Sequence, residues 1–116
     1  KDTFDLKGRA LMPLIDAARI LSLGKGIKNT ANTISRYAKL AELEPQNAPI
    51  YEACGDAFAE LLKFRTEEGL KNDSDGRYLN LSELSKLDKV KLKNDFQPIH
   101  DIQEVIKNRF QLTYFT

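Results

Sequence analysis

The 116-residue chain contains no tryptophan, one cysteine and one histidine, and it has no long apolar run. A single cysteine excludes an internal disulfide and is typical of a reducing compartment. No stretch approaches the ~20 apolar residues of a membrane-spanning helix. The polar start Lys1-Asp2-Thr3 lacks the apolar core of a signal peptide. We therefore expect a cytoplasmic protein, and the start without methionine suggests a fragment of a longer one.

The chain also lacks an excess of charge of either sign. Its 18 basic and 17 acidic residues are mixed along the sequence and give a net charge of +1. Such a balance predicts neither a nucleic-acid partner nor an anionic membrane surface. We therefore expect one folded domain that binds neither nucleic acid nor a membrane.

Motifs that would hold a metal or a phosphate are incomplete. In Asp73-Ser74-Asp75-Gly76, the spacing of a calcium loop would place a lysine in the first ligand position and no glutamate in the last. Gly24-Lys25-Gly26 lacks the Gly-Lys-Ser/Thr spacing of a phosphate loop and reads better as the end of a helix. We expect no metal and no cofactor in this domain.

Helical periodicity dominates the sequence, and no segment shows sustained period-two alternation. The predicted fold is all-α, an antiparallel bundle of four main helices with one or two short extra helices. Gly55 lies inside the third helix, where such a glycine usually marks the close approach of another helix, so we place a crossing there. The four helices are expected from about Leu11 to Leu23, from Asn32 or Thr33 to about Leu43, from about Asn47 to Leu70, and from near Ser85 to about Leu112.

Two polar residues fall on apolar stripes with steps of three or four. Arg65 continues the stripe Cys54, Phe58, Leu61, and Gln103 falls within the stripe that runs from Leu92 to Phe110. A guanidinium that faces a core is costly unless it is paired. We therefore predict an internal polar cluster that another side chain, a water, a ligand or a second protein satisfies.

Five residues form this predicted cluster, and a sixth extends it. Two pairs at spacing three join an acid to an arginine, and arginine binds planar carboxylates and phosphates through two parallel donors. Two interpretations stay open: a structural network that fixes helix register, or a groove that captures an anionic group or a partner's polar side chain. The candidate residues are Asp16, Arg19, Arg65, Glu68 and Gln103, with Arg36 at the edge.

Cys54 and His100 are each the only residue of their kind. A cysteine–histidine pair can form a nucleophile, and His100 alone could serve an independent enzyme. Cys54, however, lies on an apolar face and is expected to behave as a small hydrophobe. His100 is expected to be a partly exposed packing residue.

Several blocks, in order along nearly the whole chain, are similar to one family. The segments 5–7 and 13–23, which include Pro13-Leu14-Ile15-Asp16, resemble the opening of the nucleotidyltransferase substrate-binding domain, and 32–37 resembles its next block. Phe64-Arg65 matches the family's Leu-Arg core. The sequence departs from the family at Gly69, where many members have glutamine. The C-terminal helix is matched by Leu84-Ser85, Leu92-Lys93, Phe96, Ile102-Gln103 and Phe110.

The resemblance implies a helical C-terminal domain that follows a nucleotidyltransferase domain similar to the head of PII-uridylyltransferase, often with CBS or cyclic-nucleotide-binding modules upstream. That head carries a Gly-Ser and paired-aspartate metal motif, which this sequence lacks. Two-metal phosphoryl transfer needs clustered carboxylates. We therefore expect a domain that is inactive alone.

The leading hypothesis is an acceptor-docking domain in bacterial signal transduction. Its partners would be the nucleotidyltransferase domain of the same polypeptide and an unidentified acceptor molecule or protein. Arg19, Arg36 and Arg65 would hold the acceptor, and Asp16 and Gln103 would orient the arginines. The alternative is a helical scaffold or homodimerisation module, because the helix at 11–23 is apolar on almost every side and a second copy would cover the part that a small bundle leaves exposed.

Overall fold

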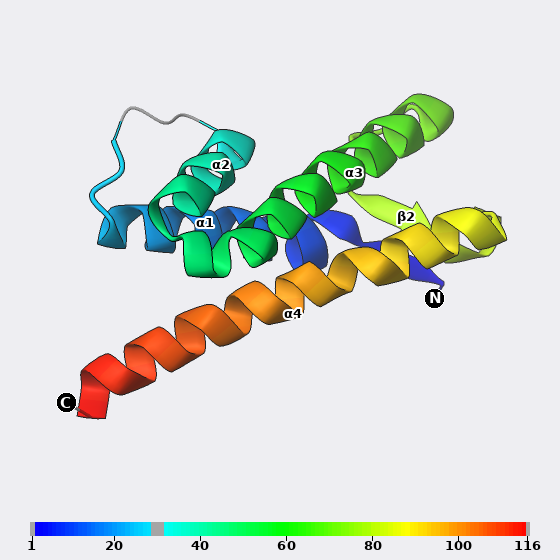
Figure 1. The fold of residues 1–116 in the computed structure, drawn as a ribbon. Coiled ribbons are helices and arrows are strands. Elements are labelled where there is room, and N and C mark those ends of the chain that lie inside the picture. The colour runs from blue at the N-terminus through cyan, green and yellow to red at the C-terminus, as the bar shows by residue number, and fades with distance from the viewer. Residues whose placement is uncertain (1, 29–31, 116) are drawn as a thin grey trace.

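The computed structural model describes residues 2–28 and 32–115, with side chains described up to residue 110. Four helices and a two-stranded ribbon make up the fold, and three short helical turns, one of them a π-helix, connect them (Figure 1). The all-α prediction is confirmed for the helices. The elements in chain order are β1 (Thr3–Asp5), η1 (Lys7–Leu11), α1 (Met12–Gly24), α2 (Thr33–Leu43), η2 (Pro45–Asn47), α3 (Ala48–Asn72), β2 (Tyr78–Asn80), η3 (Leu81–Glu83) and α4 (Lys86–Phe115).

The helix ends follow local sequence signals. Asn32 precedes α2 with extended backbone, and its Oδ1 accepts the backbone N–H of Ser35 at 2.8 Å, as an N-cap should. Pro45 follows the last turn of α2 and prevents its continuation. Ser85 precedes α4, and its Oγ accepts the backbone N–H of Asp88 at 3.0 Å. The predicted bounds of these helices are therefore close to the observed ones.

The core lies where α1, α2, α3 and α4 meet. Gly55 faces the Cβ of Tyr37 on α2, to which an added Cβ would come within 3.7 Å, so the predicted crossing at Gly55 is confirmed. The buried Tyr37 hydroxyl donates to the carbonyl of Leu14 at 2.6 Å and ties α2 to α1. Cys54 Sγ lies 3.5 Å from the carbonyl oxygen of Pro98 and sets the register of α3 against α4.

The ribbon is the element that the sequence analysis missed. β1 and β2 are antiparallel, with Phe4 opposite Leu79, and Arg77 binds Asp5 through two nitrogens at 3.0 and 3.1 Å. Strands of three residues are too short to show an alternating pattern. The ribbon joins the start of the chain to the connection between α3 and α4. In the described part of the chain, no helix is both long enough and apolar enough to cross a bilayer.

Candidate functional site

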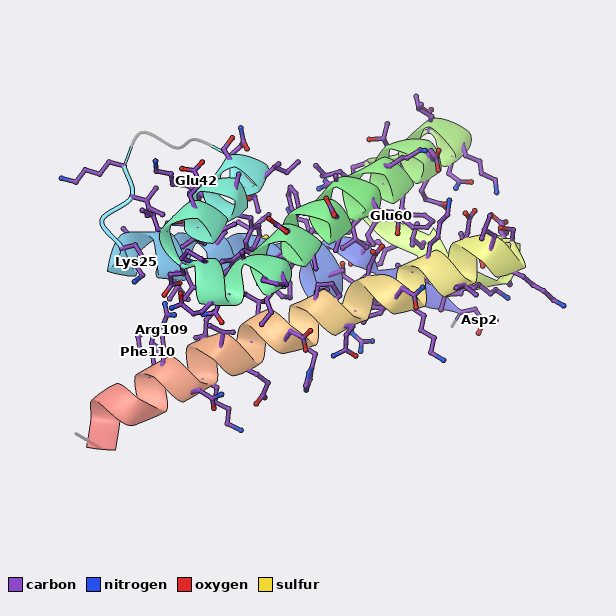
Figure 2. All side chains as sticks on the ribbon, in the orientation of Figure 1. Asp2, Lys25, Glu42, Glu60, Arg109 and Phe110 are labelled. Atoms are coloured by element: carbon purple, nitrogen blue, oxygen red, sulfur yellow. The ribbon has the colours of Figure 1, made fainter. Side chains whose placement is uncertain are left out.

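Among the described residues, the buried charged group with the most side-chain partners is Glu44, at the junction of α2 and η2. Its Oε1 accepts a hydrogen bond from the Tyr51 hydroxyl, and its Oε2 accepts one from Arg109 Nη2 at 2.8 Å. Lys25 Nζ forms an ion pair with the same Oε2 at 3.2 Å. We call Lys25, Glu44, Tyr51 and Arg109 the Glu44 cluster. It joins the end of α1, the end of α2, the first turn of α3 and the C-terminal part of α4. Figure 2 labels two of its members, Lys25 and Arg109.

The electrostatics of the Glu44 cluster keep its carboxylate charged. Burial would raise the pKa of Glu44, but the hydrogen bonds from Tyr51 and Lys25 and the nearby charge of Arg109 outweigh burial, so the net pKa is lowered. Burial and the adjacent carboxylate raise the pKa of Tyr51 to about 12. At neutral pH the cluster therefore holds one negative and two positive charges.

The two cations stand at the surface of the cluster. The Glu44 side chain is 5% exposed, whereas the Lys25 and Arg109 side chains are 38% and 35% exposed. Each cation is held in place by the buried carboxylate of Glu44, and the rest of its side chain is partly accessible to solvent. The cluster itself therefore carries a net positive charge on its exposed side, which suits the recognition of an anionic group.

A second buried carboxyl, Asp95, lies between α3 and α4. Asp95 faces Glu60 on α3, and its Oδ2 has no hydrogen-bond donor within the described residues. Burial first, and then the facing Glu60 carboxyl, raise the pKa of Asp95 far above its ordinary value. Unlike Glu44, Asp95 therefore favours its protonated form.

The six predicted site residues do not form one cluster. Asp16 and Arg19 are exposed on α1, and Arg36 is half-buried on α2. Among residues 2–28 and 32–110, no ion pair links Asp16 to Arg19. The predicted pairing within α1 is therefore wrong, while a role for these residues in binding stays a prediction.

Arg65 and Glu68 serve the turn that follows α3. Arg65 is half-buried, and its Nε donates to the carbonyl of Asp75 at 2.9 Å. Glu68 is buried, and its carboxylate accepts the side-chain amide of Asn72. In the described chain no ion pair joins Arg65 to Glu68, so this predicted pair is wrong as well.

Gln103 is exposed, and the predicted internal cluster of Arg65 and Gln103 is wrong. The contact between Cys54 and Pro98 places Gln103 level with the start of the antiparallel α3, which is about 24 Å along the helix from Arg65 at ~1.5 Å per residue. The buried residue of that turn is its neighbour Ile102. Counting four residues on from Ile99 leads to Gln103, which is exposed. The residue that continues the buried face is Ile102, three residues on from Ile99.

The sequence carried a readable signal for Asp95 but a weaker one for Glu44. Asp95 lies three residues after Leu92 and four before Ile99, both of them buried, so it occupies the core stripe of α4. Glu44 gave only the signal of a helix end before proline, and its partners Lys25 and Arg109 are distant in the sequence. The sequence analysis missed both carboxyls as buried groups.

Cys54 and His100 do not form a nucleophilic pair. Cys54 is fully buried, and burial raises the pKa of its thiol to about 12. His100 is exposed on α4, where its Nδ1 lies 3.7 Å from Asp101 Oδ1. A thiol in this environment stays protonated and unreactive.

The comparisons with known proteins gave one finding. The family model described as "Putative nucleotidyltransferase substrate binding domain" matches residues 1–110. Neither the curated proteins nor the solved structures gave a match. The matched range begins before β1 and extends into α4, and it includes all four residues of the Glu44 cluster.

Proposed function

The chain belongs to the nucleotidyltransferase substrate-binding domain family, and from this membership we propose that it holds an acceptor for a nucleotidyltransferase domain carried on the same polypeptide. In this proposal the domain does no chemistry itself. It contributes by placing the acceptor near a catalytic centre that lies outside residues 1–116, which is catalysis by positioning. A cytoplasmic role in bacterial signal transduction is part of the same proposal.

The Glu44 cluster is the observation that supports acceptor binding. A buried carboxylate holds Lys25 and Arg109 with their outer surfaces accessible, so the cost of ordering these long side chains is met before the acceptor arrives. We place an anionic group of the acceptor, such as a carboxylate or phosphate, against these two cations. Arg19 and Arg36 would extend the surface, because α1 and α2 pack against each other.

Arg65 has a different place in the proposal. Its Nε is engaged by the turn that follows α3, so we assign it a supporting role for that turn. Gln103 and Asp16 are exposed on separate helices, and we propose no orienting role for them toward Arg65.

Transfer kinetics in the full polypeptide test the proposal. We expect Lys25→Met to raise KM for the acceptor about tenfold with little change in kcat, because a charged contact made equally in the ground and transition states is lost. Arg19→Met and Arg36→Met should raise KM by smaller factors. Lys86→Met is the matched control, since it removes an exposed lysine at the opposite end of α4. An unchanged KM in folded Lys25→Met protein would refute the proposed site.

A scaffold or homodimer role is the second candidate, and exposed apolar side chains favour it. Leu23 on α1 is 78% exposed and Phe110 on α4 is 52% exposed. They neighbour Lys25 and Arg109 in the sequence, so they lie at the same end of the bundle as the Glu44 cluster (Figure 2). A second copy would cover them, which is a common way to complete a small helical core.

Sedimentation distinguishes the two candidates. A dimer that Leu23→Asp and Phe110→Asp each dissociate would support the scaffold role. Leu70→Asp is the matched control, because Leu70 is 81% exposed near the end of α3. A monomer at every concentration would remove the dimer from consideration.

A further inference from the structure

A hollow with a mainly apolar lining lies between the ribbon and the first turns of α4, and neither the family assignment nor the proposed acceptor site involves it. Figure 1 shows β2 beside this part of α4. The hollow has a volume of about 410 Å³, within the range of roughly 300–1,000 Å³ that is usual for sites of small organic molecules. The residues that line it are Phe4, Leu81, Lys89, Leu92, Lys93 and Phe96.

The apolar floor of the hollow is already assembled in the structure. Phe4 and Leu92 are buried, and the rings of Phe4 and Phe96 meet edge to face with their centroids 5.3 Å apart. Arg77 holds Asp5, the residue after Phe4, through two hydrogen bonds and so fixes the strand that carries this ring. An apolar body that enters the hollow therefore finds its contacts in place and pays little for ordering them.

Two lysines make the rim of the hollow positive. Lys89 and Lys93 are exposed and one turn apart on α4, so their side chains lie on the same face of the helix. Like charges at this spacing destabilise a helix. Within the described residues, neither lysine forms an ion pair with an acid, and no acidic side chain lines the hollow. An anion between the two ammonium groups would remove their repulsion.

The side chains next to the hollow leave this positive charge unbalanced. The guanidinium of Arg9 lies 5.3 Å from the centroid of the Phe4 ring and adds a third cation. Asp5 is bound by Arg77, and Glu83 forms an ion pair with a lysine of α3 at 3.4 Å. A ligand with one anionic group and an apolar body therefore matches both the charge and the floor of the hollow.

We propose that this hollow binds a small organic acid whose carboxylate lies between Lys89 and Lys93 and whose aryl or alkyl body rests on the apolar floor. The ligand is a free small molecule, because one carboxylate satisfies two lysines that are a single turn apart. The site is separate from the Glu44 cluster, since Lys93 and Arg109 are about 24 Å apart along α4 at ~1.5 Å per residue. The proposal therefore does not depend on the proposed acceptor site.

The test titrates the whole ¹⁵N-labelled chain with 4-phenylbutyrate and follows the backbone amide signals by NMR. We expect saturable shifts for the residues that line the hollow, with a Kd on the order of 0.1–1 mM for a ligand of about ten heavy atoms. The phenyl protons should show nuclear Overhauser effects to the rings of Phe4 and Phe96. 4-Phenylbutyramide, which has the same body without the charge, should bind about tenfold more weakly. Acetate, which has the charge without the body, should give no saturable shift in the same range of concentration.

Substitutions with a matched control locate the carboxylate. Lys89→Met and Lys93→Met keep an apolar side chain and should each raise Kd about threefold, and the double variant about tenfold. Lys91→Met is the matched control, because Lys91 lies between them in the sequence but lines a different hollow, against α3; its Kd should not change. Lys25→Met should also bind unchanged, which separates this site from the acceptor site.

Three results would overturn the proposal. The first is equal affinity for 4-phenylbutyramide and 4-phenylbutyrate, since the lysines would then have no part in binding. The second is an unchanged Kd in the double variant, with its fold confirmed by far-UV circular dichroism. The third is binding to phosphatidylglycerol vesicles without any saturable response to 4-phenylbutyrate, which would assign the two lysines to a membrane surface instead.

Discussion

Gly76 holds the turn between α3 and β2 in a conformation that no other residue can take without cost. Its φ is +72°, in the left-handed region, where an L side chain costs about 1–2 kcal/mol. An added Cβ would also lie 1.9 Å from the carbonyl oxygen of Arg65. Carbon and oxygen at this separation overlap strongly, so an alanine must push the turn away from α3.

The consequence follows from the bonds that this displacement breaks. The backbone N–H of Gly76 donates to Ser74 Oγ at 3.1 Å, and Arg65 Nε donates to Asp75 O at 2.9 Å. Each bond contributes about 1 kcal/mol net. With the backbone cost added, we expect Gly76→Ala to lower the free energy of unfolding by about 3 kcal/mol, a large part of the total stability of a small domain.

Gly26→Ala isolates the backbone cost. Gly26 also has a positive φ, +68°, but an added Cβ would meet nothing within 4 Å. We expect this variant to lose only about 1 kcal/mol. Urea unfolding followed by far-UV circular dichroism measures both losses. If the two variants lost the same stability within about 0.5 kcal/mol, the close approach of Gly76 to Arg65 would have no energetic weight and the reasoning would be wrong.

Three further predictions concern buried polar groups. Tyr37→Phe removes the hydroxyl that donates to Leu14 O at 2.6 Å and should cost about 1–2 kcal/mol in urea unfolding; an unchanged stability would contradict the role given to this bond. The Cys54 thiol, whose pKa burial raises to about 12, should react with a thiol reagent at pH 8 only after urea unfolds the chain; rapid reaction in the folded protein would show that the core opens. Asp95 has its pKa raised from 3.8 to about 8, so the native state holds more protons than the unfolded state between these values and stability falls as pH rises. Asp95→Asn should flatten this fall, and urea midpoints at pH 5 and pH 8 check it; a wild-type midpoint equal at both values would refute the assignment.

Local sequence signals predicted the helices because each signal acts within one or two turns. The Asn32 cap of α2, the stop at Pro45 and the Ser85 cap of α4 are such signals, and all three occur in the structure. The crossing at Gly55 was also predictable, since a missing side chain allows close approach. The ribbon was not, because β1 and β2 pair across more than 70 residues of sequence.

The site was harder to predict, because it depends on which of two adjacent residues faces the core. At 3.6 residues per turn, steps of three and four are both allowed. The sequence analysis assigned Gln103 to the core, but in the structure its neighbour Ile102 faces the core and Gln103 is exposed. The Glu44 cluster could not be predicted from local signals either, since Lys25, Glu44 and Arg109 lie far apart in the sequence and meet only in the folded chain.

The two buried carboxyl groups, Glu44 and Asp95, contribute to stability in opposite ranges of pH. Glu44 has a lowered pKa, so its contribution to stability is present above its ordinary value of 4.5 and is lost as pH falls through the lowered value. Asp95 has a raised pKa, so its contribution is complete at low pH and is lost as pH rises toward 8. Both groups are mainly in their preferred state between these two limits, and their combined contribution to stability is greatest in mildly acidic solution. Acidification should therefore loosen the end of the bundle that contains the Glu44 cluster first, whereas alkaline pH should first weaken the contact between α3 and α4.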